Sequence, residues 1–179
     1  MHIFLTGEIQ CGKTTIIHKV LALLPQIKAT GCCTFSLPLP DGTFAVHLGY
    51  LNAPPPEAGD ESTMVGLRLG QGGYRAYPAV FETWGVAVIA NLGTPDVIVL
   101  DELGGMENQA PRFQQAVLQL LEGDIPVLGV IKPRSLPLPD AVRTHPRVEV
   151  ITVTVENRDD LPAQIAASLK RREFRRESR

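Results

Sequence analysis

The residues with the clearest chemical pattern form a glycine-rich segment near the N-terminus, Gly7–Thr15. Gly7, Gly12, Lys13 and Thr14 fit the spacing G-x-x-x-x-G-K-[ST] of a phosphate-binding loop. Glycine permits backbone torsions that a Cβ atom would forbid, so successive N–H groups can point at phosphate oxygens. Lys13 would bring a positive charge to the β- and γ-phosphates, and the Thr14 hydroxyl would be a ligand for Mg²⁺, which prefers oxygen.

The whole loop is expected to surround the phosphates, because it lies between the apolar run His2–Thr6 and an apolar-periodic segment that begins at Ile16. This order predicts a strand, a loop and a helix whose N-terminal N–H groups and positive dipole end face the same anion. The expected nucleotide-binding residues of the loop are Gly7, Glu8, Ile9, Gln10, Cys11, Gly12, Lys13, Thr14 and Thr15.

A second pair of informative residues, Asp101 and Glu102, follows the aliphatic run Asp96–Leu100. Such a run is typical of a central parallel strand that is covered on both faces. A carboxylate at the end of a buried strand is costly unless a cation pairs with it, and Mg²⁺ is a suitable cation. We expect Asp101 to serve Mg²⁺ and Glu102 to activate the water that attacks the γ-phosphate. For Glu107, a functional and a structural role remain open.

Two further segments supply candidates for the same site. Arg134 follows the expected strand 125–131, where a cation would stabilise charge on the γ-phosphate in the transition state, although an ordinary surface position remains open. Asn157 and Arg158 lie in the last loop, where a nucleobase could bind, and Asn157 is also a typical helix-cap residue. No N-K-x-D element occurs, so nothing indicates specificity for guanine.

Length and composition predict an ordinary globular domain over residues 1–169 of this 179-residue chain. No apolar run approaches the roughly 20 residues of a membrane span, and a strand begins too early for a secretory leader. We therefore expect a cytoplasmic protein that does not contact membranes. The three cysteines, Cys11, Cys32 and Cys33, predict reduced thiols, because their spacing suits neither a disulfide framework nor a zinc site.

The last ten residues, 170–179, form a basic tail with six basic and two acidic side chains. The rest of the chain then carries 11 basic and 17 acidic residues, a net charge of −6. Nucleic-acid binding by the body of the protein is therefore not expected, and only weak contact through the tail remains open. The favoured interpretation of the tail is a solvated helix end, where cations also suit the helix dipole.

Strand and helix patterns alternate along the chain, which predicts a three-layer α/β fold around a mostly parallel sheet. A turn at Leu39–Gly42 between two strand patterns predicts an added β-hairpin, and the proline-rich segment 52–61 predicts an exposed, mobile loop. The expected strands cover 2–6, 29–37, 43–51, 63–69, 96–100, 125–131 and 148–153, and the expected helices cover 16–24, 78–92, 109–122 and the segment from 161 to 169.

Three segments together resemble a known family. They are Gly7–Thr15 (GEIQCGKTT), Asp101–Glu107 (DELGGME) and Val155–Asp159 (VENRD). Their order and spacing are similar to those of the small P-loop nucleoside-triphosphatases that include the cancer-related nucleoside-triphosphatase, whose members read close to GxxGxGKTT, DEIGxME and a late ENRD. The resemblance implies Mg²⁺-dependent hydrolysis of ATP, GTP and other nucleoside triphosphates. The segment 52–61 has no clear equivalent in that family.

By position, the resemblance implies roles for individual residues of this chain. It implies that Asp101 serves Mg²⁺ and that Glu102 handles the attacking water. It also implies phosphate binding by Gly7, Gly12, Lys13, Thr14 and Thr15.

Two other functions use the same loop and metal. A kinase would transfer the γ-phosphate to a small acceptor, and Arg134, Arg143 and Arg147 would then form a mobile basic lid. A nucleotide-dependent switch would bind a partner through the 52–61 loop or the tail. Glu102 beside Asp101 favours hydrolysis, because it suits activation of water. The oligomeric state is left open.

Overall fold

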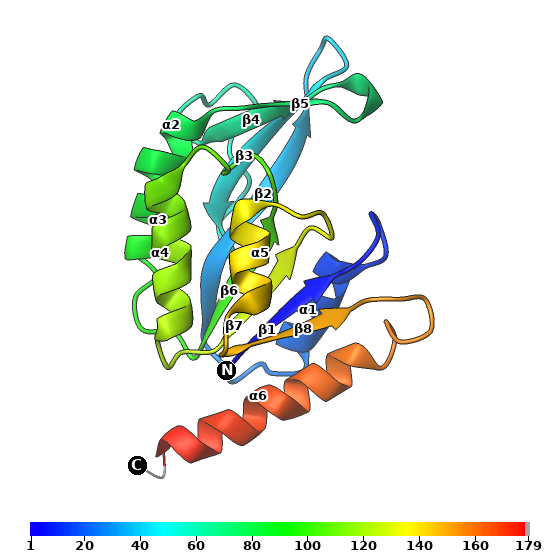
Figure 1. The fold of residues 1–179 in the computed structure, drawn as a ribbon, viewed down its shortest axis with the longest axis vertical. Helices are drawn as coiled ribbons and strands as arrows, with labels where there is room; N and C mark the ends of the chain where they lie inside the picture. The colour runs from blue at the N-terminus through cyan, green and yellow to red at the C-terminus, as the bar shows by residue number, and fades with distance from the viewer. Residues whose placement is uncertain (178–179) are drawn as a thin grey trace.

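The computed structural model describes residues 1–177, and the strands that it contains form one mixed sheet (Figure 1). The strands are β1 His2–Thr6, β2 Ala29–Pro38, β3 Phe44–Tyr50, β4 Met64–Arg68, β5 Tyr74–Ala76, β6 Val97–Leu103, β7 Val127–Ile131 and β8 Val148–Thr152. Their order across the sheet is β5-β4-β3-β2-β6-β7-β1-β8. The pairs from β2 to β8 are parallel, and the pairs from β2 to β5 are antiparallel. The mostly parallel α/β sheet that the sequence predicted is confirmed.

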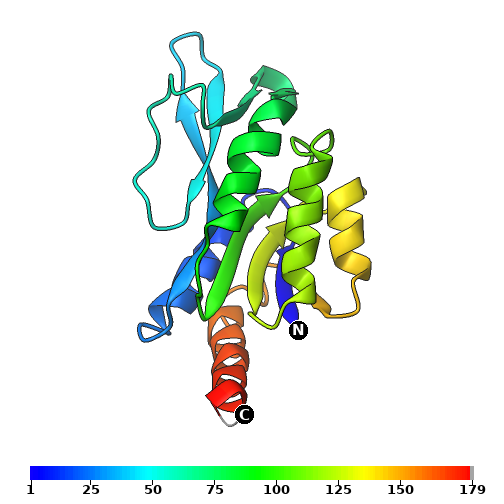
Figure 2. The same ribbon diagram turned by 90° about the vertical axis from the view of Figure 1, so that its left-hand side faces the viewer.

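Helices cover both faces of the parallel part of the sheet (Figures 1 and 2). One face packs against α1 Lys13–Ala22 and α6 Leu161–Glu177, and the other packs against the helical segments between Pro78 and Thr144. These segments are α2 Pro78–Val80, the π-helical turn Phe81–Gly85, α3 Val86–Ala90, α4 Pro111–Glu122 and α5 Pro137–Thr144. The molecule therefore has the three predicted layers.

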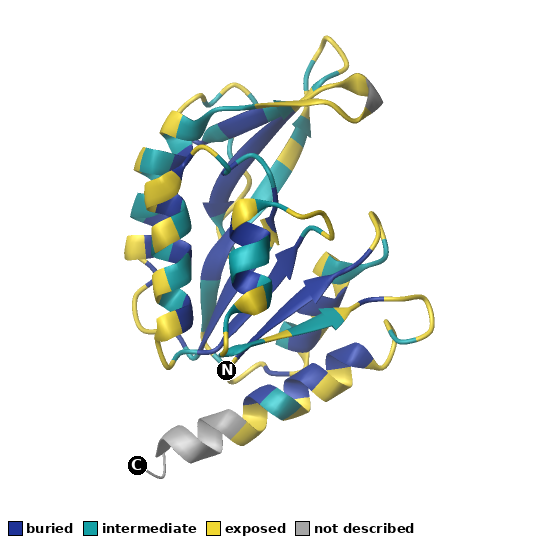
Figure 3. Ribbon diagram, in the orientation of Figure 1, coloured by how far each residue is buried: buried dark blue, intermediate teal, exposed yellow. Residues whose placement is uncertain are grey.

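Each face of the sheet carries its own hydrophobic core (Figure 3). Every residue of β1 and β7 is buried, as expected for central strands with helices on both sides. Leu161, Ile165 and Leu169 of α6 are buried as the sequence predicted. This packing fixes the carboxyl ends of β1, β6 and β7, where ligands of α/β proteins bind.

The predicted β-hairpin is confirmed as β2 and β3, but it is part of the main sheet. The first half of β2 pairs in parallel with β6 from Ala29 to Cys32, and the second half pairs with β3 from Cys32 to Pro38. Strands β4 and β5 continue the same sheet outwards. The ten residues of β2 thus join the parallel and antiparallel parts.

One predicted helix differs in detail from the structure, and one helix was not predicted. The expected helix 78–92 runs from Pro78 to Ala90, with a π-helical turn in its middle. There, a Cβ on Gly85 would lie 2.8 Å from Phe113 Cδ2, so the glycine admits the Phe113 ring. Helix α5 was not predicted from the sequence, because prolines normally interrupt helices. Here they occupy the first turn, where proline is tolerated.

The proline-rich segment 52–61 is largely exposed, as predicted, but it is anchored to the sheet. Nε2 of the buried His47 lies 3.3 Å from the Ala58 carbonyl oxygen, and its Nδ1 lies 2.9 Å from Thr63 Oγ1. Asn52 Nδ2 donates to the Ala29 carbonyl at 3.0 Å. The loop is therefore held at its start and near its end.

The backbone of α6 continues into the predicted basic tail as far as Glu177. Lys170 and Arg171 are exposed, and the side chains of residues 172–179 lie outside the described part of the chain. None of the described helices is both long and apolar enough to cross a membrane. Cys11, Cys32 and Cys33 are free thiols, as expected.

Candidate nucleotide-binding site

Residues Gly7–Gly12 form a curved loop between β1 and α1, and Lys13, Thr14 and Thr15 are the first residues of α1. Gly7 and Gly12 have φ angles of 140° and 98°, and Gln10 also has a positive φ of 63°. A Cβ on Gly7 would lie 2.7 Å from the Val153 carbonyl oxygen, so the close approach of the loop after β8 requires glycine. The glycine spacing predicted backbone torsions of this kind.

Lys13 lies within the curve of this loop. Its Nζ donates to the carbonyl oxygens of Gly7 at 2.9 Å and Glu8 at 2.6 Å, and lies 3.5 Å from Cys11 Sγ. Helix α1 has no side-chain cap and no acidic residue in its first turn. The positive end of α1 and the Lys13 ammonium thus face the same space, where an anion would be stabilised.

Asp101 lies close to this loop although it is far from it in the sequence. Thr14 Oγ1 donates to Asp101 Oδ1 at 3.2 Å, across 87 positions of the chain. Burial raises the pKa of Asp101, and the negative charge of Glu102 raises it further, while Thr14, His18 and Lys13 lower it. A carboxylate whose charge is penalised by burial is suited to receive a cation.

The oxygens of Thr14 and Asp101 fit a magnesium site, because Mg²⁺ prefers hard oxygen donors and takes its other ligands from phosphates and water. Among the described residues, no group of three or more His, Cys, Asp and Glu side chains could hold a metal ion alone. The arrangement therefore suits a metal that arrives with a nucleotide.

Glu102 is turned towards β7 by an irregularity at the end of β6. The register between β6 and β7 shifts between Leu100 and Leu103, and Glu102 has a φ of 73°. Its carboxylate Oε1 lies 3.2 Å from Nζ of Lys132, and both side chains are about half-exposed. Lys132 could not be predicted as a site residue from the sequence, because it stands just beyond β7 with no motif around it.

Glu107, for which two roles were open, has a structural one. Its side chain is 3% exposed, and its Oε1 accepts a hydrogen bond from the Gly104 N–H at 2.5 Å. Burial raises its pKa, whereas this backbone hydrogen bond and the charge of Lys132 lower it. Glu107 therefore holds the loop that follows Glu102 in its turned conformation.

Arg134 lies in the exposed segment between β7 and α5. Within the described residues its guanidinium has no hydrogen-bond or ion-pair partner, and the structure does not bring it to another site residue. Arg143 bonds to Asp140 and to the Lys132 carbonyl, while Arg147 Nη2 lies 2.9 Å from Asp124. In the kinase alternative these three arginines would form a mobile lid, but in this structure Arg143 and Arg147 are bonded to other parts of the fold.

Asn157 and Arg158 follow β8 next to the phosphate loop. Asn157 Oδ1 accepts from the Thr154 N–H, and its Nδ2 donates to the Thr152 carbonyl, both at 2.9 Å. Both ends of this amide therefore stabilise the turn between β8 and α6. Because the amide bonds to no N–H in the described part of α6, these hydrogen bonds are not the helix-cap role that the sequence suggested. Arg158 is exposed, and Val155 beside it is 67% exposed.

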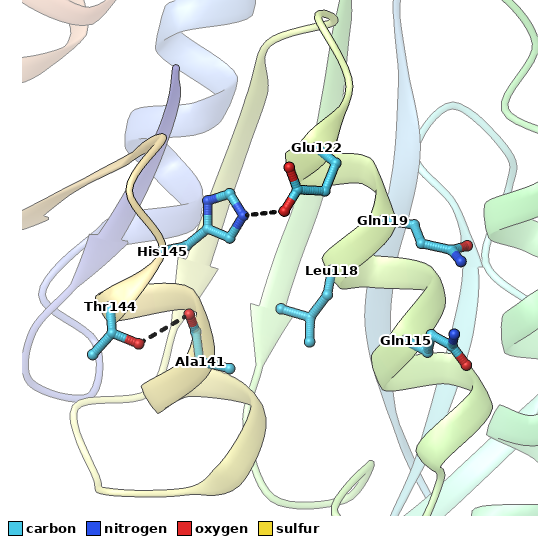
Figure 4. Close-up of a pocket in the computed structure, with 7 residues that line it drawn as sticks. All are labelled: Gln115, Leu118, Gln119, Glu122, Ala141, Thr144 and His145. Atoms are coloured by element: carbon cyan, nitrogen blue, oxygen red, sulfur yellow. Dashed lines mark hydrogen bonds and ion pairs between the residues drawn. The ribbon is translucent and has the colours of Figure 1, made fainter.

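A separate groove lies between α4 and α5 (Figure 4). His145 Nε2 and Glu122 Oε1 are 3.1 Å apart in it. These residues stand at the ends of α5 and α4 that lead into β8 and β7, so the groove lies towards the amino ends of the strands. It is lined by Gln115, Leu118, Gln119, Glu122, Ala141, Thr144 and His145. None of the predicted site residues lies in it.

Known proteins are similar to this chain in sequence and in fold. A family model described as NTPase matches residues 58–166, which include the Asp101–Glu107 segment. A cancer-related nucleoside-triphosphatase homolog from Bos taurus is 32% identical and covers 94% of this chain and 96% of its own. The nucleoside-triphosphatase THEP1 from Thermofilum pendens is also 32% identical, over 92% of this chain and 93% of its own.

Two solved structures agree with this assignment. The crystal structure of THEP1 from Aquifex aeolicus has a TM-score of 0.71 at 24% identity, covers 94% of this chain and 99% of its own, and shows the shared fold. The solution structure of a human cancer-related nucleoside triphosphatase has a TM-score of 0.64 at 30% identity and covers 94% and 96%. With the phosphate loop and the Thr14–Asp101 contact in place, these similarities show that the chain belongs to the nucleoside-triphosphatase family.

Proposed function

We propose that this protein hydrolyses nucleoside triphosphates to the diphosphate and inorganic phosphate in a Mg²⁺-dependent reaction. The observation that carries the proposal is the hydrogen bond of 3.2 Å between Thr14 and Asp101, which joins the phosphate loop to the end of β6. The names of the relatives, nucleoside-triphosphatase THEP1 and cancer-related nucleoside-triphosphatase homolog, support the same activity. Because the chain has no N-K-x-D element that would select guanine, we propose that it accepts a broad range of nucleoside triphosphates, ATP and GTP included.

Substrate binding begins at the loop Gly7–Thr15. Its backbone N–H groups and the N-terminus of α1 would bind the phosphates, and Lys13 would exchange the carbonyl oxygens of Gly7 and Glu8 for phosphate oxygens. Thr14 and Asp101 would hold Mg²⁺. When bound, the ion supplies charge neutralisation to the phosphates.

Hydrolysis requires a water in line with the bond that breaks. Glu102 would orient this water and accept its proton while the water oxygen bonds to the γ-phosphorus. The bond between the γ-phosphorus and the bridging oxygen breaks, and the diphosphate leaves with its electron pair. The half-exposed carboxylate of Glu102 is open to water at the carboxyl end of β6, as this role requires. Arg134 remains a candidate for added positive charge near the γ-phosphate.

The test is release of inorganic phosphate from a panel of nucleoside triphosphates, with Mg²⁺ and with excess chelator. We expect Lys13→Ala to abolish activity by removing charge compensation. We expect Glu102→Gln to retain nucleotide binding and to lose about 100-fold or more in kcat, the usual contribution of a general base. Glu149→Gln, on the exposed part of β8, is the matched control and keeps the parental rate.

Two results would contradict the proposal. Hydrolysis by Glu102→Gln at the parental rate would exclude water activation by this residue. Phosphate transfer that appears only when a nucleoside or another small acceptor is added would identify a kinase instead. A cytoplasmic location, a single domain over residues 1–169 and nucleic-acid contact limited to the tail remain predictions from the sequence.

A further inference from the structure

We propose that Lys132 is a positioning residue for Glu102, an inference that rests on the proposed function. Lys132 would hold one carboxylate oxygen of Glu102 so that the other is free to accept the proton of the attacking water. The geometry that points to this role has three parts, which are the order of the strands, the space made for the Lys132 side chain and the backbone conformation of Glu102.

The order of the strands places Lys132 between the two halves of the site. Strand β7 lies between β6, which ends in Asp101 and Glu102, and β1, which leads into the phosphate loop. Lys132 is the first residue after β7, and its N–H donates to the Leu103 carbonyl at 3.0 Å. This hydrogen bond ties the backbone of Lys132 to the irregular end of β6, so the two side chains start from fixed positions.

The Lys132 side chain also has a space of its own. A Cβ on Gly104 would lie 2.7 Å from Lys132 Cδ and 2.9 Å from its Cε, so a larger residue there would force the lysine side chain to leave this position. Glu107 keeps this glycine in place through its hydrogen bond to the Gly104 N–H. The segment after Glu102 thus packs against the Lys132 side chain, although no sequence motif links this segment to Lys132.

Stability alone does not explain this arrangement. An ion pair between half-exposed side chains contributes at most about 1 kcal/mol to folding. Glu102 adopts a positive φ, which is unfavourable for any residue with a Cβ atom, and such residues concentrate at functional sites. This conformation turns the carboxylate towards Lys132. The ion pair therefore fixes the direction of the Glu102 carboxylate, whereas it adds little to the stability of the fold.

The chemistry of the pair follows from its atoms. Within the described residues, Oε1 of Glu102 contacts Lys132 Nζ and Oε2 has no partner. Further negative charge lies near Glu102, because its charge raises the pKa values of Asp101 and Glu107, and the charge of Lys132 lowers the pKa of Glu107. Without Lys132, repulsion from these two carboxylates would turn Glu102 away towards water.

The experiment compares Lys132→Met, Lys132→Arg and the control Lys28→Met. Methionine keeps most of the aliphatic chain beside Gly104 but removes the charge. Lys28 is exposed just before β2, at the amino ends of the parallel strands and therefore away from the site. We expect Lys132→Met to lower kcat about tenfold or more with KM changed less than about twofold, since the lost interaction acts on the chemical step. We expect Lys132→Arg to recover most of the rate and Lys28→Met to match the parent.

A double variant separates positioning from other roles. If Lys132 acts through Glu102, adding Lys132→Met to Glu102→Gln causes no further loss in single-turnover rate. An equal loss in both backgrounds would overturn the inference, because it would show that Lys132 acts independently of Glu102. An unchanged kcat for Lys132→Met, or a fall that Lys132→Arg does not reverse, would overturn it as well.

The failure of the proposed function looks different. In that case the parent protein releases no phosphate, or Glu102→Gln is as active as the parent, and both proposals fall together. When only the inference fails, Glu102→Gln still loses most of its kcat, whereas Lys132→Met is unaffected, is not rescued by Lys132→Arg, or causes the same loss in both backgrounds. Thermal unfolding of each variant shows that it is folded before its rate is compared.

Discussion

At the scale of single residues, the site is a set of polar side chains that are held by one another before a nucleotide binds. Lys13 is bonded to carbonyl oxygens of its own loop, and Thr14 is bonded to Asp101. Nucleotide binding therefore exchanges existing hydrogen bonds for bonds to phosphate, which costs less than ordering free side chains. The hydroxyl that bonds to Asp101 is the same one that we propose as a ligand of Mg²⁺.

Replacing Thr14 by valine tests this dependence. Valine has nearly the same shape but no hydroxyl, so one ligand of Mg²⁺ and one hydrogen bond to Asp101 are lost together. We expect the Mg²⁺ concentration for half-maximal activity to rise about tenfold or more, as one lost charge-assisted contact of about 1.5–3 kcal/mol implies. A titration of phosphate release against MgCl₂ measures the change.

The control for this variant is Thr144→Val, at the exposed end of α5. Its hydroxyl bonds only to backbone carbonyls of its own helix, so the Mg²⁺ requirement is expected to match that of the parent. An unchanged Mg²⁺ requirement in Thr14→Val would contradict the metal-binding role of Thr14.

At the scale of elements, the close contact of β2 with β6 decides whether the antiparallel part of the sheet continues the parallel part. Gly31 lies in this contact, and a Cβ placed on it would lie 1.9 Å from the Val99 carbonyl oxygen. The clash is with backbone, so no side chain could move aside to relieve it.

We expect Gly31→Ala to lower the free energy of unfolding by about 2–3 kcal/mol, in the upper range of overpacking effects. In a domain of this size the midpoint of thermal unfolding would fall by roughly 5–10 °C. Gly59→Ala is the control, because a Cβ at Gly59 meets nothing within 4 Å. Equal unfolding midpoints for both variants would show that β2 does not pack against β6 in this way.

At the scale of the whole molecule, the buried His2 links the first strand to segments more than a hundred residues away. Its Nδ1 accepts from the Val127 N–H at 3.1 Å, and its Nε2 lies 2.9 Å from the Leu121 carbonyl, to which it donates. The neutral ring satisfies both partners. Burial, with help from the charge of the N-terminus, lowers its pKa from 6.5 to about 4.

This lowered pKa predicts a pH dependence of stability. Between pH 6.5 and 4 the unfolded chain binds a proton at His2 that the folded protein does not, so stability is full above pH 6.5 and falls towards pH 4. The loss from His2 is expected to be about 2–3 kcal/mol. Urea unfolding of the parent and of His2→Gln across this range measures it.

Other buried groups also titrate in or near this range, which is why the comparison with His2→Gln is needed. Burial lowers the pKa of His47 and adds to the same trend. Burial raises the pKa values of Asp101 and Glu107, so these carboxyls favour folding as the pH falls. Parallel pH profiles for the parent and for His2→Gln would exclude the contribution of His2.

The sequence by itself determined the features that depend on neighbouring residues. The phosphate loop follows from glycines at set positions, because their torsions are local. The central strands follow from aliphatic runs such as Asp96–Leu100, because a strand buried on both faces needs apolar side chains throughout. Asp101 and Glu102 could be predicted as site residues because they directly follow such a run.

Only the tertiary structure decided what stands beside these residues. Lys132 meets Glu102 because β7 lies between β6 and β1, and periodicity along the chain does not encode the order of strands in a sheet. The same holds for two glycines. Gly104 lies against the Lys132 side chain, and Gly31 lies against the Val99 backbone, and the sequence shows neither contact. Which residues of different strands lie side by side depends on how the whole core packs, because each helix and strand buries its apolar face against the others.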